Sequence, residues 1–569
     1  MNRYLAKGLP VIALLGAVAC TDLTENPYDA ITEANFKPTA GDLAAMLGPV
    51  YSNPQRGLWM GWYGMIDWQG EVSDELLTPV RPNGWDDGGI YYANHQHRWT
   101  ANGPGMANGR WGNAYDGINA ANRVIYQIEE GVLPLDEATA KKTIAELRAA
   151  RAYYYYILMD LFGSVPVVTD FRNTELPSQS TRQQVYEFVT SELNAAMPDL
   201  SDDASAAMYG RMNKWAAKGV LVRVYLNAGV YTGTPQWQKV IQTADEIINS
   251  GKFAVAPTYR EVFSRTNHTS KEIIFAAPYD ETFAAGNNFH MKTLKPALRI
   301  VFGMASGNPW GGSAGNPQFI DTYDPEDTRL NGVPADIGKG GSFLTGPHWD
   351  APHQNGYTFG KYLPGMRDQT CAGKESIMPA REIQNQPVTK IQFSDGYPVW
   401  KYEIYSGMLG SSSVDFPVIR YPEVLFAKAE ALLRLGQPGA GALVTQVRQR
   451  AFSKTNPAKA TVTDAELAAT GSKYNYGWYD CDGVVKTGPG GTPVTNGGAG
   501  VQFGRMYDEW GWEFAVEVQR RMHMIRFGTF TTMKWFNHDP STSGAFKTIF
   551  AIPQGRLNSN PNLVQNPGY

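Results

Sequence analysis

The stretch that most constrains the fold is Glu146–Asp170, where a long helical pattern runs into a sharp stop. Its apolar residues recur at helical spacing and two arginines repeat one turn apart, so we expect a helix with one buried face. Gly163 ends this helix. Pro166 then favours an extended segment over Val165–Thr169, because proline fixes its own φ and disfavours helix in the preceding residue.

Four consecutive tyrosines, Tyr153–Tyr156, occupy the middle of this helix. Successive side chains on an α-helix point in different directions, so the four rings cannot all face one neighbour. We expect some of them to line the core with a hydrogen-bonded hydroxyl, and others to meet a neighbouring helix or solvent.

Two further segments carry helical patterns and are expected to pair. Arg211–Asn227 contains small residues, including Gly219, which permit a close helix approach. Trp237–Ile248 has apolar residues at the spacing of an amphipathic helix, with Gly251 as its cap. Helix pairs of this size predict a short tetratricopeptide-like array, in which each pair buries its apolar face against its neighbours.

Elsewhere, helical patterns alternate with irregular stretches. Ala40–Ser52 is expected to form the first helix and Lys271–Ala277 a strand. Clusters of Gly, Asn and Pro between Phe253 and Phe416 predict a long loop-rich part. The Gly-, Thr- and Pro-rich stretch Lys454–Gly500 is interpreted as an insertion.

The first twenty residues have the pattern of an export signal. Arg3 and Lys7 form a positive start, ten mostly apolar residues follow, and small residues end directly at Cys20. Ten residues are too few to span a membrane as a helix. An ordinary secretory signal is compatible with this pattern, but the cysteine favours a lipoprotein signal peptide over residues 1–20, with Cys20 acylated.

The composition bears on the class of protein. Lys and Arg number 50 against 54 for Asp and Glu, so nothing indicates a surface that binds nucleic acid. The 569 residues are enough for a large core or for a long helical repeat fold. Aromatic residues make up 12% of the chain, a content compatible with a surface that binds flat ligands such as sugar rings.

Beyond Cys20, the chain contains only Cys371 and Cys481. A disulfide between them is compatible with an exported protein, because that compartment is oxidising, and two free buried thiols are an equal alternative. Two thiols cannot build a four-thiolate zinc site.

Tryptophan is concentrated between Gly57 and Trp111, among Gly, Asn and Asp residues. Helical spacing is absent there until Trp111, so we expect loops that carry binding residues. The alternative for each tryptophan is that it packs beneath the loops as a core residue. The tryptophans concerned are Trp59, Trp62, Trp68, Trp85, Trp99 and Trp111.

Several motifs follow one another in the order seen in one protein family. SDELLTPVRPNGWDDGG lies at Ser73–Gly89, and RAYYYYILMDLFGSVPVVT at Arg151–Thr169. RYPEVLFAKAEAL follows at Arg420–Leu432, DEWGWEFAVEVQRRMHMIRFG at Asp508–Gly528, and NPNLVQNPGY ends the chain. Together these blocks resemble the SusD/RagB-like outer-membrane nutrient-binding lipoproteins. His523 departs from the family pattern, which has Asp at that place.

The resemblance implies a mainly α fold, a tetratricopeptide-like helical repeat scaffold (SusD-like) with a large loop-rich binding face. Residues 21–260 would form the SusD-like N-terminal region and 261–569 the RagB/SusD C-terminal region. It also implies a surface-exposed, lipid-anchored protein of the outer membrane. Such a protein captures extracellular nutrient, here expected to be oligosaccharide, and delivers it to a SusC-like TonB-dependent transporter.

The expected mechanism of capture is stacking of tryptophan faces on sugar rings, with polar groups hydrogen-bonding the hydroxyls. The candidate glycan-binding residues are Arg81, Trp85, Asn102 and Trp310, since Trp and Asn gather in this part of the chain and around Trp310. Two alternatives stay open. One is a peptide-capturing member of the same family, which would need pairing edges and apolar pockets, and the other is a secreted glycoside hydrolase.

No motif requires catalysis, a cofactor or a metal. His95 and His97 would lie on one side of a strand without an evident third ligand, which favours a hydrogen-bonding role over zinc. Gly311–Gly315 fits the letters G-x-S-x-G but lacks the flanking strand and helix of a nucleophile elbow. The spaced acids of Asp321–Asp327 lack the glycine and bidentate glutamate of a calcium loop. We therefore expect a binding protein and no enzyme.

Overall fold

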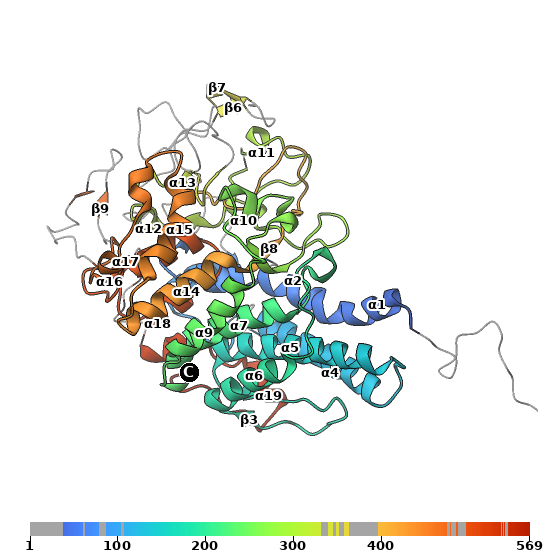
Figure 1. Cartoon of the computed structure of the whole chain (residues 1–569). Helices are drawn as coiled ribbons and strands as arrows, with labels where there is room; N and C mark the ends of the chain where they lie inside the picture. The colour runs from blue at the N-terminus through green and yellow to red at the C-terminus, as the bar shows by residue number, and fades with distance from the viewer. Residues whose placement is uncertain are drawn as a thin grey trace, which may run out of the picture.

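The computed structural model describes residues 38–60, 63–78, 87–103, 107–296, 298–331, 340–344, 349–351, 358–362, 397–474, 478–479, 485–486, 497–535, 538, 540 and 544–569. These residues are mainly helical (Figure 1), so the predicted mainly α fold is confirmed. The α-helices are α1 (Ala40–Tyr51), α2 (Asn53–Trp59), α3 (Ile90–His95), α4 (Asn113–Glu129), α5 (Glu137–Phe162), α6 (Arg182–Ala196), α7 (Lys214–Leu226), α8 (Ala228–Thr232), α9 (Trp237–Asn249), α10 (Phe289–Thr293), α11 (Leu298–Val301), α12 (Pro317–Ile320), α13 (Thr328–Asn331), α14 (Tyr421–Arg434), α15 (Ala440–Phe452), α16 (Asp464–Ala468), α17 (Gly504–Phe514), α18 (Arg520–Arg526) and α19 (Gln554–Ser559). The strands are β1 (Leu76–Leu77), β2 (Val165–Pro166), β3 (Gln179–Ser180), β4 (Ile273–Ala277), β5 (Ala314–Gly315), β6 (Trp349–Ala351), β7 (Thr358–Tyr362), β8 (Phe416–Arg420), β9 (Trp478–Tyr479) and β10 (Val485–Lys486).

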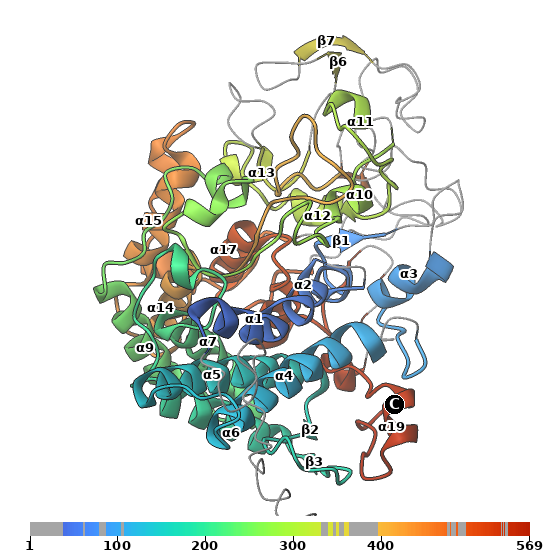
Figure 2. The ribbon, with the colours of Figure 1, turned by 90° about the vertical axis from the view of Figure 1, so that its right-hand side faces the viewer.

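Neighbouring helices form a scaffold at one end of the molecule. α4 packs against α5, α5 against α6, and α7 against α9, which confirms the expected pairing of 211–227 with 237–248. α14 comes from the second half of the chain and packs against both α9 and α15. One hydrophobic core therefore runs through both expected regions, 21–260 and 261–569, and the division between them stays a prediction about the sequence. Short helices and loops around α10 and α11 lie at the opposite end (Figure 2).

Local chemistry sets the ends of α5. Asp136 caps its start by accepting a hydrogen bond from the Thr139 N–H at 2.9 Å. Gly163 ends it with a φ of 72°, which glycine adopts without strain, so the predicted stop is confirmed. The expectation of one buried face was wrong. Nearly every side chain over 145–162 is buried, because α5 contacts α4, α6 and α7.

All four tyrosines of α5 are buried, and none of them meets solvent. Each hydroxyl instead reaches a neighbouring element, which satisfies its hydrogen-bonding capacity inside the core. Tyr153 accepts from Trp59 Nε1 at 2.9 Å, Tyr154 donates to the Val50 carbonyl, Tyr155 donates to the Val168 carbonyl at 3.0 Å, and Tyr156 donates to Met522 Sδ at 3.2 Å.

An antiparallel strand pair, β4 and β8, joins the two halves of the chain. The predicted strand at Lys271–Ala277 is confirmed, although it begins at Ile273. α7 approaches this pair closely at Gly219, where a Cβ atom would lie 2.9 Å from the Ile419 Cγ2 atom. Gly219 was expected to allow the close approach of another helix, and it instead allows the close approach of a side chain from strand β8.

A buried ionic cluster lies at the end of β8. Arg420 contacts Glu272, Glu513 and Glu517 with nitrogen–oxygen distances of 2.5, 3.0 and 2.6 Å, and all four side chains are fully buried. Burial opposes the charge of Glu513, but neighbouring arginines, Arg450 first, lower its pKa to about 2. Charges removed from water are tolerated only when they are paired in this way.

The family motif at Asp508–Gly528 is divided between two helices, α17 and α18. Between the two helices, Val516 and Val518 have φ values of 60° and 58°, a region that β-branched residues rarely adopt. The backbone of Val516 is bound on both sides: its N–H donates to Glu75 Oε2 at 3.1 Å and its carbonyl accepts from the Tyr402 hydroxyl at 2.9 Å. These tertiary contacts override the local helical pattern.

A second, smaller hydrophobic cluster underlies the loop-rich end, where sequence analysis placed the irregular part of the chain. Its buried members come from α10, α11 and the residues that follow each of them, and from the segment 400–408, together with Leu344. They are Met291, Leu294, Leu298, Phe302, Met304, Leu344, Trp400, Ile404 and Met408.

Within the described ranges, no helix is both long and apolar enough to cross a bilayer. Cys20, Cys371 and Cys481 lie outside those ranges. The acylation of Cys20 and the state of the other two cysteines therefore stay predictions.

Candidate functional site

Trp310 lies at the loop-rich end and is attached to α10. Its N–H donates to the Met291 carbonyl at 2.7 Å, and the Gly312 N–H donates to the Lys292 carbonyl at 2.7 Å. The Trp310 side chain is half-buried against the smaller hydrophobic cluster. The ring is thus supported by the protein and still reaches the surface, which a stacking platform requires.

β5 begins four positions after Trp310 and pairs with β1, with Leu76 opposite Gly315. This pairing brings the Thr78 hydroxyl to 2.9 Å from the Ser313 hydroxyl. Thr78 precedes the stretch 79–86, which contains Arg81 and Trp85 and lies outside the described residues.

The residue that follows this stretch, Asp87, is connected to the same helix α10. Asp87 Oδ2 accepts from the Tyr63 hydroxyl at 2.7 Å, and the ring of Tyr63 stacks on Tyr91 with centroids 6.1 Å apart. Lys292 of α10 lies over the Tyr91 ring, with Nζ 3.8 Å from its centroid, and forms a buried ion pair with Asp67.

Both flanks of 79–86 therefore converge on α10, together with Trp310. We call this region, made of Asp87, α10 and Trp310, the α10 face. In Figure 2, α10 lies above β1, and α3 lies beside β1 at mid-height on the right, in agreement with the contact between α3 and β1.

Asn102 lies in another part of the molecule. It is exposed on the loop before α4, and the neighbouring Ala101 carbonyl accepts from the Gln554 N–H at 3.1 Å, at the start of α19. In Figure 2, α19 is at the lower right and α10 in the upper half, so the structure does not bring Asn102 and Trp310 together.

The tryptophan-rich segment contains more helix than sequence analysis predicted. α2, α3 and two π-helical turns, Ile66–Gly70 and Ala107–Gly112, lie within or across it, so the expectation of loops alone was wrong. The core alternative is confirmed for its described tryptophans, which are all buried. Trp59, Trp68, Trp99 and Trp111 are 2%, 1%, 3% and 5% exposed.

The first two acids of the motif at Ser73–Gly89, Asp74 and Glu75, are structural. Arg520 donates to both carboxylate oxygens of Asp74, at 2.7 and 2.8 Å. Glu75 accepts from the Val516 N–H, and burial raises the pKa of Glu75 to about 8 against the opposing effect of Arg520.

Three weaker motifs also prove to be structural. His95 ends helix α3, so its expected place on a strand was wrong, and His97 Nε2 lies 2.8 Å from the Val72 carbonyl. Ser313 is 1% exposed and lies before a strand, not after one, which is the reverse of a nucleophile elbow. Asp327 pairs with Arg329 at 2.7 Å. In the part of the chain that the structure describes, no group of three His, Cys, Asp or Glu side chains is arranged to bind a metal.

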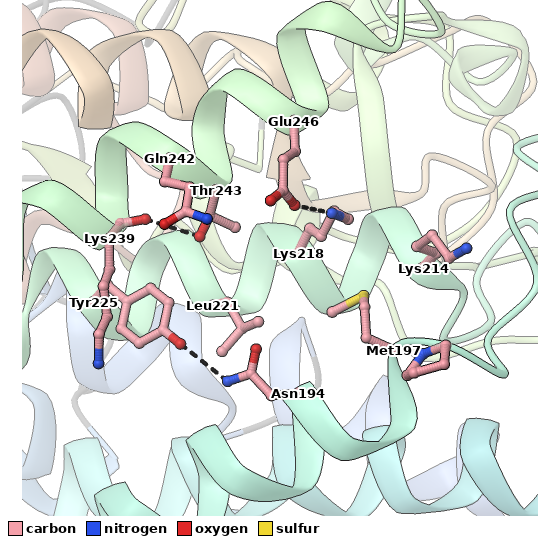
Figure 3. A pocket seen from close by; sticks show the side chains of 11 residues that line it. Asn194, Met197, Lys214, Lys218, Leu221, Tyr225, Lys239, Gln242, Thr243 and Glu246 are labelled. Atoms are coloured by element: carbon pink, nitrogen blue, oxygen red, sulfur yellow. Dashed lines mark hydrogen bonds and ion pairs between the residues drawn. The ribbon is translucent and has the colours of Figure 1, made fainter.

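A separate groove lies on the scaffold between α6, α7 and α9 (Figure 3), with a cavity volume of about 670 Å³. No motif in the sequence indicates this groove, because its polar residues are spread over three helices. Its lining consists of Asn194, Met197, Pro198, Lys214, Lys218, Leu221, Tyr225, Lys239, Gln242, Thr243 and Glu246.

Two family models match this chain. The model described as "SusD family" covers residues 271–569, and the one described as "Starch-binding associating with outer membrane" covers 84–226. The chain belongs to the SusD family. The resemblance seen in the sequence motifs is thereby confirmed.

Curated relatives of this SusD family member cover much or all of its length. It is 26% identical to the starch-binding protein SusD of Bacteroides thetaiotaomicron over 459 residues, which are 76% of this chain and 74% of the relative. It is 22% identical to the SusD-like protein P25 of Formosa agariphila, over 98% of both chains.

Solved structures agree on the fold of this SusD family member. A laminarin binding SusD-like protein matches 94% of this chain and 100% of its own, with a TM-score of 0.63 and 19% identity. The surface glycan-binding protein A from Bacteroides fluxus gives the same coverage, with a TM-score of 0.62 and 19% identity. At these identities, the likeness establishes the fold and not the ligand.

Proposed function

We propose that this protein captures extracellular oligosaccharide at the outer-membrane surface and delivers it to a SusC-like TonB-dependent transporter. Membership of the SusD family supports glycan capture, and relatives above are named for binding starch, laminarin or glycan. The lipid anchor at Cys20, the surface location and the transporter rest on the sequence pattern and the family.

The observation that carries the proposal is the position of Trp310 on the α10 face. The indole of Trp310 is half-buried and its backbone is bound to α10, so stacking on a pyranose ring would cost little ordering on binding. Arg81 and Trp85 lie between Thr78 and Asp87, whose contacts converge on α10, so we assign them to the same ligand site. Asn102, near α19, would contact only a longer glycan or a separate part of it.

The proposal describes binding without turnover. Trp310 and Asp87 can stack on and hydrogen-bond a sugar, and both actions stabilise a bound ligand without breaking a bond. A peptide-capturing protein or a glycoside hydrolase would behave differently in one and the same experiment.

The test is a binding screen of the protein that lacks residues 1–20, against starch, laminarin, other polysaccharides and peptides. Affinity gel electrophoresis detects binding, and chromatography of each mixture detects products. Retardation by a polysaccharide that stays intact is expected. Released sugars would replace the proposal with an enzyme, and binding of peptides alone would replace the ligand.

A further inference from the structure

The groove between α6, α7 and α9 has a preformed shape. Its floor includes Leu221 of α7, which is 2% exposed. Asn194 of α6 donates from Nδ2 to the Tyr225 hydroxyl of α7 at 3.1 Å, and Lys218 of α7 pairs with Glu246 of α9 (Figure 3). These two contacts cross-link the three helices, so the groove does not have to be ordered when a ligand enters.

Positive charge exceeds negative charge in the groove. Its lining includes three lysines and one acid, Glu246, which is already paired with Lys218. Lys214 and Lys239 make no ion pair with any part of the chain that the structure describes, and Lys239 Nζ lies 5.4 Å from the centroid of the Tyr225 ring. Figure 3 shows Lys239 and Lys214 at opposite ends, with Leu221 between them.

The groove offers hydrogen-bonding groups to a ligand but no open aromatic face. Gln242 is exposed, and its carboxamide makes no hydrogen bond within the described ranges, which leaves both a donor and an acceptor for a ligand. Tyr225 is the one aromatic ring among the lining residues, and Lys239 already lies over it. A sugar would therefore find no open aromatic platform here.

From this arrangement we propose that the groove binds an extended acidic segment of a protein partner. Acidic side chains at its two ends would meet Lys214 and Lys239, and the exposed carboxamide of Gln242 would hydrogen-bond the backbone of the segment between them. Helical repeat scaffolds present such concave surfaces for extended ligands. The groove lies on the scaffold, away from the α10 face (Figure 1), so this inference does not depend on glycan capture.

The test uses fluorescence anisotropy with the protein that lacks residues 1–20. The probe is a labelled octapeptide in which glutamate alternates with leucine, and the matched probe has glutamine in place of glutamate. The acidic probe is expected to bind, and to bind more weakly as the salt concentration rises from about 50 to about 500 mM, since salt screens exposed charges. The glutamine probe is expected not to bind.

Charge-reversal variants locate the site. Lys214→Glu and Lys239→Glu are each expected to weaken binding of the acidic probe by about tenfold or more. Lys454→Glu makes the same charge change at an exposed lysine outside the groove lining and should leave the affinity unchanged. All three variants should keep the melting temperature of the unmodified protein and its binding to any polysaccharide found above.

Three outcomes would overturn the proposal. In the first, the acidic probe does not bind to the folded protein. In the second, Lys454→Glu weakens binding of the acidic probe as much as Lys214→Glu and Lys239→Glu do. In the third, a hexagalacturonate binds through Lys214 and Lys239 while the peptide does not, which would make the groove a site for acidic sugars.

Discussion

Arg520 donates to both carboxylate oxygens of Asp74, at 2.7 and 2.8 Å, although 446 positions separate the two residues. Both side chains are buried. Asp74 belongs to the motif at Ser73–Gly89, just before β1. Arg520 belongs to the motif at Asp508–Gly528 and begins α18. Two motifs from opposite ends of the chain are thus the two halves of one contact.

Asp74→Asn is expected to lower the free energy of unfolding by about 3–5 kcal/mol, because it leaves a buried guanidinium without its counter-charge. Urea denaturation measures the effect. The double variant Asp74→Leu, Arg520→Met removes both charges and should recover part of the loss. If Asp74→Asn is as stable as the unmodified protein, the ion pair contributes nothing net.

Glu75 should make stability fall as pH rises. Burial raises its pKa in the folded state from 4.5 to about 8, so the folded protein binds more protons than the unfolded chain in this interval. The contribution of Glu75 to the free energy of unfolding is fully present below pH 4.5 and is lost as pH rises through 8. Glu75→Gln keeps an acceptor for Val516 and should be less sensitive to pH, as seen by thermal unfolding across the interval. Parallel curves for the two proteins would contradict this.

His523 should act in the opposite direction. Burial, with Arg526 and Arg520 nearby, lowers its pKa well below 6.5, so the folded protein keeps it neutral while the unfolded chain takes up a proton. The stability that depends on the neutral ring is present above pH 6.5 and is lost as pH falls. His523→Gln should therefore lose less stability on acidification than the unmodified protein. His268→Gln, at an exposed position, serves as the control and should leave that loss unchanged.

Gly117 should tolerate no larger residue. A Cβ atom there would lie 2.4 Å from Cε2 of Tyr154, whose hydroxyl is bound to the Val50 carbonyl. Gly117→Ala is expected to cost about 1–3 kcal/mol through overpacking. Gly48→Ala, in α1 with no atom within 4 Å of the added carbon, should be neutral or stabilising by about 0.5–1 kcal/mol. Chemical denaturation of both variants checks the difference, and equal effects would contradict it.

Trp310→Ala should separate binding from packing. Loss of the stacking face is expected to weaken glycan affinity by about tenfold or more, with little change in melting temperature, since the ring is only half-buried. Trp400, in the same hydrophobic cluster, is 5% exposed, so Trp400→Ala should cost about 3–5 kcal/mol of stability. A comparable loss of stability in Trp310→Ala would make Trp310 a core residue.

The sequence predicted the features that depend on neighbouring residues. The stop of α5 at Gly163 and the pairing of α7 with α9 were confirmed, because glycine conformation and apolar spacing act within a few residues. The family was also readable, since its motifs keep their order along the chain.

Only the tertiary structure decided how distant residues meet. The break between α17 and α18 at Val516 depends on Glu75, which lies 441 positions away, so no local sequence pattern predicts it. The burial of the described tryptophans and the groove between α6, α7 and α9 likewise arise from segments brought together by folding. Local propensity acts over one turn of chain, whereas burial and charge pairing act between whichever groups the packed core leaves adjacent.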